Sequence, residues 1–222
     1  MKNFQIRSGF RLCGLIFTAL LVIGCQTVYY NTMEKFGVQK HEILVDRVED
    51  ARNGQEEAKE QFKTALERFN EVINFDGGVL EEKYEILNAE YKRCQSKAET
   101  VSDRIAAVED VGEALFKEWE AELSQYTNAS LRQSSQRKMI QTRREFDQLI
   151  RSMRRAEDRI APVLAAFQDQ VLFLKHNLNA SAIASLKSEL AVVETDVASL
   201  IREMEAAIAE ADGFIKTMVD AR

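Results

Sequence analysis

Four stretches of the chain carry apolar residues that repeat in alternating steps of four and three residues. They cover residues 44–72, 80–119, 139–174 and 183–218, and no stretch needs a change of phase. Repeats of this kind place one apolar stripe, here called a seam, on each helix of a bundle that packs knobs into holes. Gln55 and Gln170 are polar members of two seams. No alternation typical of strands competes with this pattern, so the sequence predicts an all-α fold.

Turn-forming clusters separate the four stretches at residues 76–78, 127–130 and 177–181. Glycine reverses the chain, and Asn and Ser also cap the helix that follows. Connections this short join antiparallel neighbours. We therefore predict one elongated antiparallel four-helix bundle or coiled coil with up-down-up-down topology, with helices over approximately residues 38–75, 79–126, 130–177 and 180–220.

Two local signals oppose unbroken helices. Asn53-Gly54 is a turn dipeptide, but the first seam continues through it. Pro162 costs about 3 kcal/mol inside a helix, but the third seam keeps its phase across it. A helix that bends without ending fits the second signal, so we expect a kink at Pro162.

The N-terminus has the order of a secretory signal. Lys2, Arg7 and Arg11 precede an apolar run over residues 12–23, which Gly24-Cys25 closes. The run is shorter than the ~20 residues that span a bilayer. Its end resembles the lipobox of bacterial lipoproteins, which implies removal of residues 1–24 and acylation of Cys25. Residues 25–40 would then be a lipid-anchored segment leading into the bundle of residues 41–222. A plain signal peptide or an uncleaved anchor is the alternative.

Charge restricts the partners. Loss of residues 1–24 removes three basic residues and no acidic one, so the formal net charge moves from -6 to -9. An acidic chain is a poor partner for nucleic acid and for anionic headgroups, which both attract clustered Lys and Arg. We expect attachment to the membrane through the acyl groups of Cys25.

Cysteine usage excludes an internal disulfide in the mature chain. Cys13 leaves with the signal and Cys25 is acylated, so Cys94 alone remains. Its position in the second seam favours a buried, apolar-like role over a reactive thiol.

The third predicted helix is rich in basic residues, and the second offers acidic ones at the same height. The basic set is Arg132, Arg137, Lys138, Arg143, Arg144, Arg151, Arg154, Arg155 and Arg159, and the acidic set is Glu109, Asp110, Glu113, Glu118, Glu120 and Glu122. Opposite charges on adjacent helices fix pairing and register. The alternative is a stripe that binds lipopolysaccharide phosphates or another anion.

The chemistry of enzymes is absent from the sequence. His41 and His176 are the only histidines, and neither follows a Glu at the spacing of bundle metal sites. There is no phosphate-binding loop, nucleophile turn or Cys–His pairing. We expect no catalytic residues, no metal and no cofactor.

The turn after the third predicted helix is a candidate partner-binding tip. It contains Lys175, His176, Asn177 and Asn179. The alternative for His176 is a helix-end histidine stabilised by the helix dipole.

Several segments resemble an uncharacterised family of proteobacterial coiled-coil lipoproteins, a domain of unknown function. They are Tyr29-Tyr30, Lys40, residues 43–48 (ILVDRV), residues 115–119 (LFKEW) and residues 171–180 (VLFLKHNLNA). The resemblance implies an exported lipoprotein of a Gram-negative envelope and no activity. Gln26 after the cysteine resembles lipoproteins sent on to the outer membrane.

These observations predict a lipoprotein on the periplasmic face of the outer membrane, serving as a structural or adaptor element for an unknown envelope protein or cell-wall partner. Two alternatives remain open. One is a bundle that holds an apolar ligand or lipid between Trp119, Phe146 and Phe167, and the other is a self-assembling envelope coiled coil. The oligomeric state is not predicted.

Overall fold

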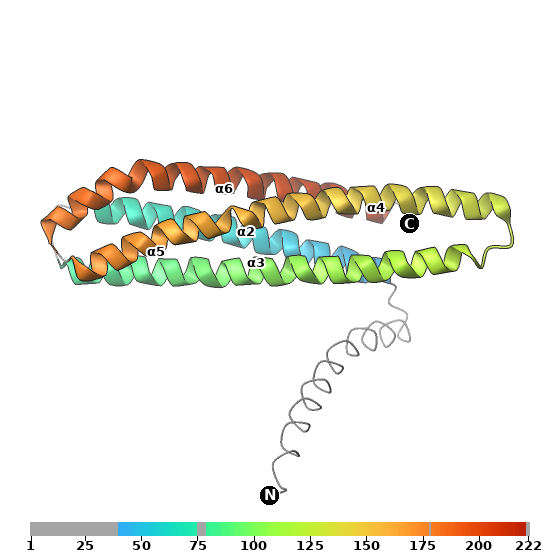
Figure 1. Cartoon of the computed structure of the whole chain (residues 1–222), viewed down its shortest axis with the longest axis horizontal. Helices are drawn as coiled ribbons and strands as arrows, with labels where there is room; N and C mark the ends of the chain where they lie inside the picture. The colour runs from blue at the N-terminus through green and yellow to red at the C-terminus, as the bar shows by residue number, and fades with distance from the viewer. Residues whose placement is uncertain (1–39, 75–78, 178, 221–222) are drawn as a thin grey trace, which may run out of the picture. The chain divides into compact units, whose positions relative to one another are not determined.

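The computed structural model describes residues 40–74, 79–177 and 179–220, and within this part of the chain no strand occurs. The helices are α2 (Lys40–Ile73), α3 (Leu80–Leu123), α4 (Ala129–Asp158), α5 (Ile160–His176) and α6 (Ala180–Asp220) (Figure 1). The residues from Leu44 onward form one compact unit, an all-α bundle as predicted. The signal region and Cys25 lie outside the described residues.

Contacts between helices establish the up-down-up-down topology. From α2 to α3, Asp50 O accepts from Arg104 Nη1 at 2.8 Å, and Glu57 Oε2 pairs with Lys97 Nζ at 2.7 Å. Numbers rise on one helix as they fall on the other, so these helices are antiparallel. The same order holds between α3 and α4 and between α4 and α6, where Gln148 Nε2 donates to Glu210 Oε1 at 2.9 Å.

The predicted seams form the core. Every position of the first seam from Leu44 to Val72 is buried, including Gln55. The third and fourth seams are buried over most of their length, with Leu149, Met153, Leu200 and Met204 fully enclosed. Burial of apolar surface at about 25 cal/mol per Å² is the main stabilising contribution to such a bundle.

The second seam departs from the prediction near its end. Phe116 is buried there, whereas Leu115 is half-buried. The reason is Gly112, because a Cβ built at this position would lie 2.2 Å from Phe146 Cζ. The missing side chain lets the Phe146 ring approach α3, where it packs edge-on against Phe116 with ring centroids 5.4 Å apart.

The third predicted helix is interrupted at a single residue, which fits the expected kink but places it at Arg159, before Pro162. α4 ends at Asp158 and α5 begins at Ile160, and Arg159 between them keeps a right-handed helical backbone with φ -78° and ψ -15°. Proline lacks an N–H and its ring clashes with the carbonyl four residues earlier, here that of Asp158. The interruption therefore precedes Pro162, which occupies the first turn of α5, where an N–H has no intrahelical partner.

Other local signals act as the sequence predicts. α2 continues through Asn53-Gly54, where the buried Gly54 faces the side chain of Arg104. Asn128 caps α4, since its Oδ1 accepts from the backbone N–H of Ser130 at 2.9 Å and of Leu131 at 3.1 Å.

The last part of α3 and the first part of α4 continue past the other described helices of the bundle. Figure 1 shows this hairpin extending beyond the C-terminal end of α6. We call residues 115–142 the hairpin end. Beyond the last residues of α6, its two helices have only each other to pack against among the described helices. Most of its side chains are therefore exposed or half-buried, although Phe116 and Thr142 are buried.

Candidate functional site

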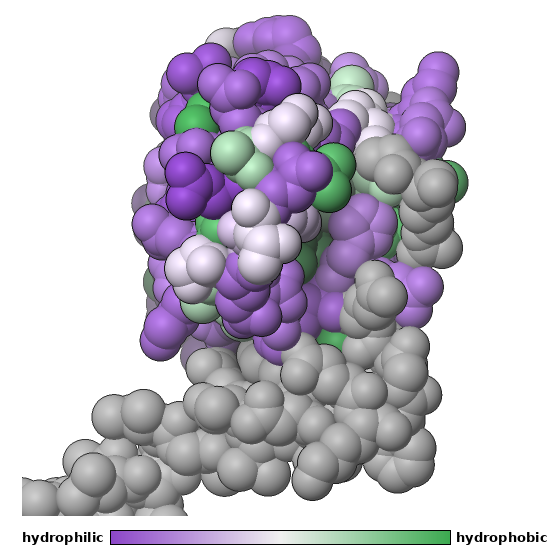
Figure 2. Space-filling model, turned by 90° about the vertical axis from the view of Figure 1, so that its right-hand side faces the viewer, coloured by the Kyte–Doolittle hydropathy of each residue, from purple (hydrophilic) through white to green (hydrophobic). Residues whose placement is uncertain are grey.

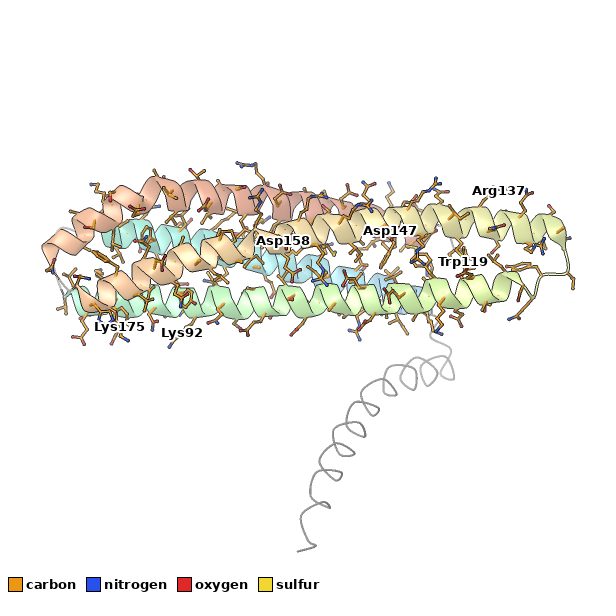
Figure 3. All side chains as sticks on the ribbon, viewed as in Figure 1. Lys92, Trp119, Arg137, Asp147, Asp158 and Lys175 are labelled. Atoms are coloured by element: carbon orange, nitrogen blue, oxygen red, sulfur yellow. The ribbon has the colours of Figure 1, made fainter. Side chains whose placement is uncertain are left out.

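The predicted partner-binding tip lies at the end of α5. Lys175 and His176 are exposed, and Figure 3 shows Lys175 at this end of the bundle. Asn177 is the C-cap of α5, and its Nδ2 donates to Phe173 O at 2.9 Å. The backbone N–H of Asn179 donates to Asn177 O at 2.8 Å. The Asn177 amide therefore has a structural role, which leaves Lys175 and His176 with outward-facing polar groups.

Two apolar side chains beside this tip escaped the sequence analysis. Leu172 is 45% exposed and Phe173 is 39% exposed, whereas Val171 and Leu174 are buried. Residues 171–174 (VLFL) are all apolar, and one helix face cannot bury four consecutive side chains. The run in the sequence therefore already indicated that some of these side chains would be exposed. The tip thus combines exposed apolar and basic groups.

The hairpin end, at the opposite end of the bundle, carries a second group of accessible apolar side chains. Leu131 is 58% exposed, and Leu115, Trp119, Leu123 and Met139 are half-buried. Seen from this end, the surface is mostly hydrophilic with separate hydrophobic side chains (Figure 2). The apolar pattern of α3 and α4 thus continues where no further described helix covers it.

A hydrogen bond holds the two helices of the hairpin end together. Trp119 Nε1 donates to Ser135 Oγ at 2.8 Å, and Figure 3 shows Trp119 between α3 and α4. Because its only polar atom is bonded, the indole ring keeps a fixed position while part of its apolar surface stays accessible. Trp119 is the single tryptophan of the chain.

The predicted pairing of charges between α3 and α4 is concentrated at Arg154. Its Nε donates to Glu109 Oε1 at 3.1 Å, and its Nη1 donates to Glu157 Oε2 at 2.6 Å on its own helix. These carboxylates raise the pKa of Arg154 above its ordinary value. Arg143 lies over the Phe116 ring at 5.2 Å from its centroid, and Arg155 Nε lies 3.8 Å from Glu203 Oε2 on α6.

Five other members of the basic set do not pair with an acidic side chain. Arg132, Arg137, Lys138, Arg144 and Arg151 make no ion pair within the described part of the chain. Figure 3 shows Arg137 on the outer side of α4. The charge pattern therefore fixes the register of α3 and α4 at one point and leaves several guanidinium groups accessible to solvent.

Cys94 and Gln55 are among the side chains with polar atoms that the core buries. Cys94 is fully buried and its thiol contacts Gln61 O at 3.9 Å, so the predicted apolar-like role holds. Burial raises the pKa of Cys94 to about 12. Gln55 is also fully buried, and within the described chain neither Nε2 nor Oε1 of its amide has a hydrogen-bond partner.

The residues predicted to enclose an apolar ligand lie in separate places. Phe146 packs against Phe116 and Phe214, and Phe167 packs against Phe62 and Phe69, whereas Trp119 belongs to the hairpin end. The depression beside Phe167 and Leu87 has a volume of 10 Å³, room for at most one water molecule. The structure does not bring Trp119, Phe146 and Phe167 into one cavity.

The described residues were also compared with the requirements of a metal site and of a membrane-spanning helix. No group of three or more His, Cys, Asp or Glu side chains among them could hold a metal ion. None of the helices described combines the length and the apolar character that crossing a bilayer requires.

Comparison with known sequences connects the chain to other proteins. The family described as "Protein of unknown function (DUF2959)" matches residues 29–218. The match covers all five described helices except the last residues of α6. No curated protein matches the chain.

Proposed function

The chain belongs to the DUF2959 family of proteins of unknown function, and from that premise we propose that it is an outer-membrane-anchored periplasmic lipoprotein with a structural or adaptor role. The observation that carries the proposal is the closed core, in which the seams fill the bundle from Leu44 to Met218. The depression beside Phe167 and Leu87, at the edge of this core, has a volume of 10 Å³, which is too small for a substrate. Interaction is then left to the outer faces and the two ends of the bundle.

The mechanism is positional. Acylation of Cys25 fixes the chain to the membrane, and two acyl chains suffice for stable anchoring. The helices rise 1.5 Å per residue, so the two ends of the bundle offer separate surfaces to partners. Partners from the envelope then bind at an end, where the apolar side chains Leu131 or Phe173 are accessible.

The anchor is tested by palmitate labelling of cells that produce the wild type or the Cys25→Ser variant, followed by separation of the inner and outer membranes. The wild type incorporates label and sediments with the outer membrane, and the variant does neither. Labelling of both proteins, or of neither, contradicts the anchor.

The adaptor role is tested by photo-cross-linking in living cells. A photo-reactive phenylalanine analogue replaces Leu131 or Leu172, one at each end, and Val192 on the side of α6 serves as the control because it is 56% exposed. We expect the same protein or cell-wall adduct from repeated experiments at an end position and none at Val192. Adducts with lipid alone, or equal adducts at all three positions, contradict the adaptor role.

A further inference from the structure

The outer side of α4 carries a straight line of arginines. Arg137, Arg144 and Arg151 follow one another at intervals of seven residues, which is two helical turns or about 10.5 Å along the helix. All three are exposed, whereas Thr142 and Phe146, two residues to either side of Arg144, are buried. Two residues are about half a helical turn, so these arginines point away from the core. We call the three arginines the basic line.

The basic line begins where the chain separates its charges. Residues 129–144 contain five basic side chains and no acidic one. The net charge after loss of residues 1–24 is -9, so these five positive charges leave -14 for the rest of that chain. The net charge predicts repulsion from anionic headgroups, whereas this distribution leaves one face of the protein positive.

The acidic residues of the chain do not neutralise the basic line. None of its guanidinium groups makes an ion pair within the residues that the structure describes, and Figure 3 shows Arg137 on the outer side of α4. The residues outside the described part contain two acidic side chains, Glu34 and Asp76. Two carboxylates are too few for the five basic side chains of α4 that lack an ion pair among the described residues.

The surroundings of the basic line disfavour a small anion as its ligand. Arg143 and Arg151 border a depression of 480 Å³ between α3 and α4. Four carboxylates border the same depression and repel a small anion, those of Glu109, Asp110, Glu113 and Asp147. Ile140 is 42% exposed and lies on the side of α4 that carries Arg137 and Arg144, three residues after the first and four before the second. An open helix face with a line of cations and one apolar side chain suits an extended anionic surface.

We propose that the basic line binds the phosphate groups of an anionic membrane surface, so that the bundle lies along the membrane with α4 against it. Each Arg or Lys near such a surface strengthens binding about fivefold. The acidic side chains of α2, α3 and α6 lie farther from that surface, and salt screens charges beyond about 8 Å. The inference rests on the membrane anchor proposed above and deepens it, because the anchor brings the chain to the membrane and the basic line orients it there.

The test couples purified protein to vesicles through Cys25 and therefore does not depend on acylation in the cell. Removal of residues 1–24 together with Cys94→Ala leaves Cys25 as the only thiol, which reacts with a lipid that carries a maleimide headgroup. A photo-reactive phenylalanine analogue replaces Ile140 beside the basic line, or Val192 on α6, which is 56% exposed and serves as the matched position. The vesicles consist of phosphatidylcholine alone or of phosphatidylcholine with anionic phosphatidylglycerol.

With anionic vesicles we expect at least about tenfold more lipid adduct from position 140 than from position 192, since three arginines at about fivefold each outweigh the repulsion of the screened acidic residues. The two positions give equal yields with phosphatidylcholine alone. They also give equal yields with anionic vesicles at about 1 M salt, where the Debye length is about 3 Å.

Variants separate the basic line from the net charge. Replacing all three arginines of the line by Gln removes the excess of adduct at position 140. The matched control removes three exposed basic side chains of α3 and α6 and therefore changes the net charge equally, with the substitutions Lys92→Gln, Lys187→Gln and Arg202→Gln. The control keeps the excess at position 140. Both variants retain wild-type helicity and melting, because the substituted side chains are exposed.

Three results would overturn the proposal. They are equal adducts at the two positions with anionic vesicles, an excess that survives in the variant of the basic line, and an excess that the control variant also loses. Adducts between two copies of the protein, in place of lipid adducts at position 140, also overturn it, because a second copy then covers the line. Since maleimide coupling replaces acylation, these outcomes leave the palmitate test of the Cys25 anchor independent.

Discussion

Gln55 is the residue whose chemistry contrasts most with its surroundings. It occupies a seam position between Ala51 and Ala58, is fully buried, and has no hydrogen-bond partner for its amide within the described chain. An unpaired buried amide costs about 1–3 kcal/mol. A polar residue at a single core position of a coiled coil fixes register at a cost in stability, which gives Gln55 a structural explanation.

Replacing this amide should stabilise the bundle. Gln55→Met keeps the length of the side chain and removes both unpaired atoms, so we expect the free energy of unfolding to rise by about 1–3 kcal/mol in urea titrations. Gln61→Met is the control on the same helix, because Gln61 Nε2 donates to Glu90 Oε2 at 2.7 Å. That variant should lose stability. A loss in Gln55→Met would mean that its amide is satisfied in solution.

Gly112 and Gly213 offer a matched pair of glycine substitutions in helices. Gly112→Ala places a methyl group against the rigid ring of Phe146, and we expect the free energy of unfolding to fall by about 1–3 kcal/mol despite the better helix propensity. Gly213→Ala meets nothing within 4 Å and should gain up to about 1 kcal/mol. Thermal melting of both variants measures the difference, and equal shifts would contradict the packing of Phe146 on α3.

Cys94 should be a protected thiol. Burial raises its pKa from 9.0 to about 12, so the native thiol stays protonated and does not react with a disulfide reagent at about pH 8. Unfolding in urea should release its reactivity. Since the protonated form is favoured in the native state, the stability from this group is complete below pH 9 and falls as the pH rises toward 12. Cys94→Ala should lack that decline.

At the scale of helices, the interruption at Arg159 allows a prediction about how proline substitutions in α5 change stability. Pro162 lies in the first turn of α5, so Pro162→Ala should change the free energy of unfolding by no more than about 0.5 kcal/mol. Ala165→Pro, at an exposed position in the interior of α5, should cost about 3 kcal/mol or more. Circular dichroism with urea titration compares the two variants. A large loss in Pro162→Ala would show that the proline itself orients α5.

The seams were predictable from the sequence because each is a local pattern that every helix carries by itself. The position of the kink was less predictable, since the seam passes through Pro162 unchanged and only the clash with the carbonyl of Asp158 places the kink before the proline. The hairpin end was not predictable, because the pattern at Trp119 and Met139 is the same whether or not a neighbour covers it.

The candidate tip was also predictable from the sequence only in part. Lys175, His176, Asn177 and Asn179 are close in sequence, so their grouping at one end follows from the turn. Their neighbour Phe173 became part of the surface only when the helix faces were known. The role of Cys25 stays a prediction from the signal.

At the scale of the whole bundle, burial is distributed unevenly along its length. Near Cys94 and Val108 four helices share the core, whereas the hairpin end has two described helices and few fully buried side chains. Local opening costs less free energy where fewer apolar contacts are lost. The hairpin end is therefore the end expected to open most often.

Hydrogen exchange measured by mass spectrometry tests this gradient. We expect the amides of residues 117–141 to exchange about a hundredfold faster than those of residues 94–108, since a difference of about 2.7 kcal/mol in opening free energy is enough for that ratio. Uniform protection along α3 in the free protein would mean that the hairpin end already has the cover that its apolar pattern requires.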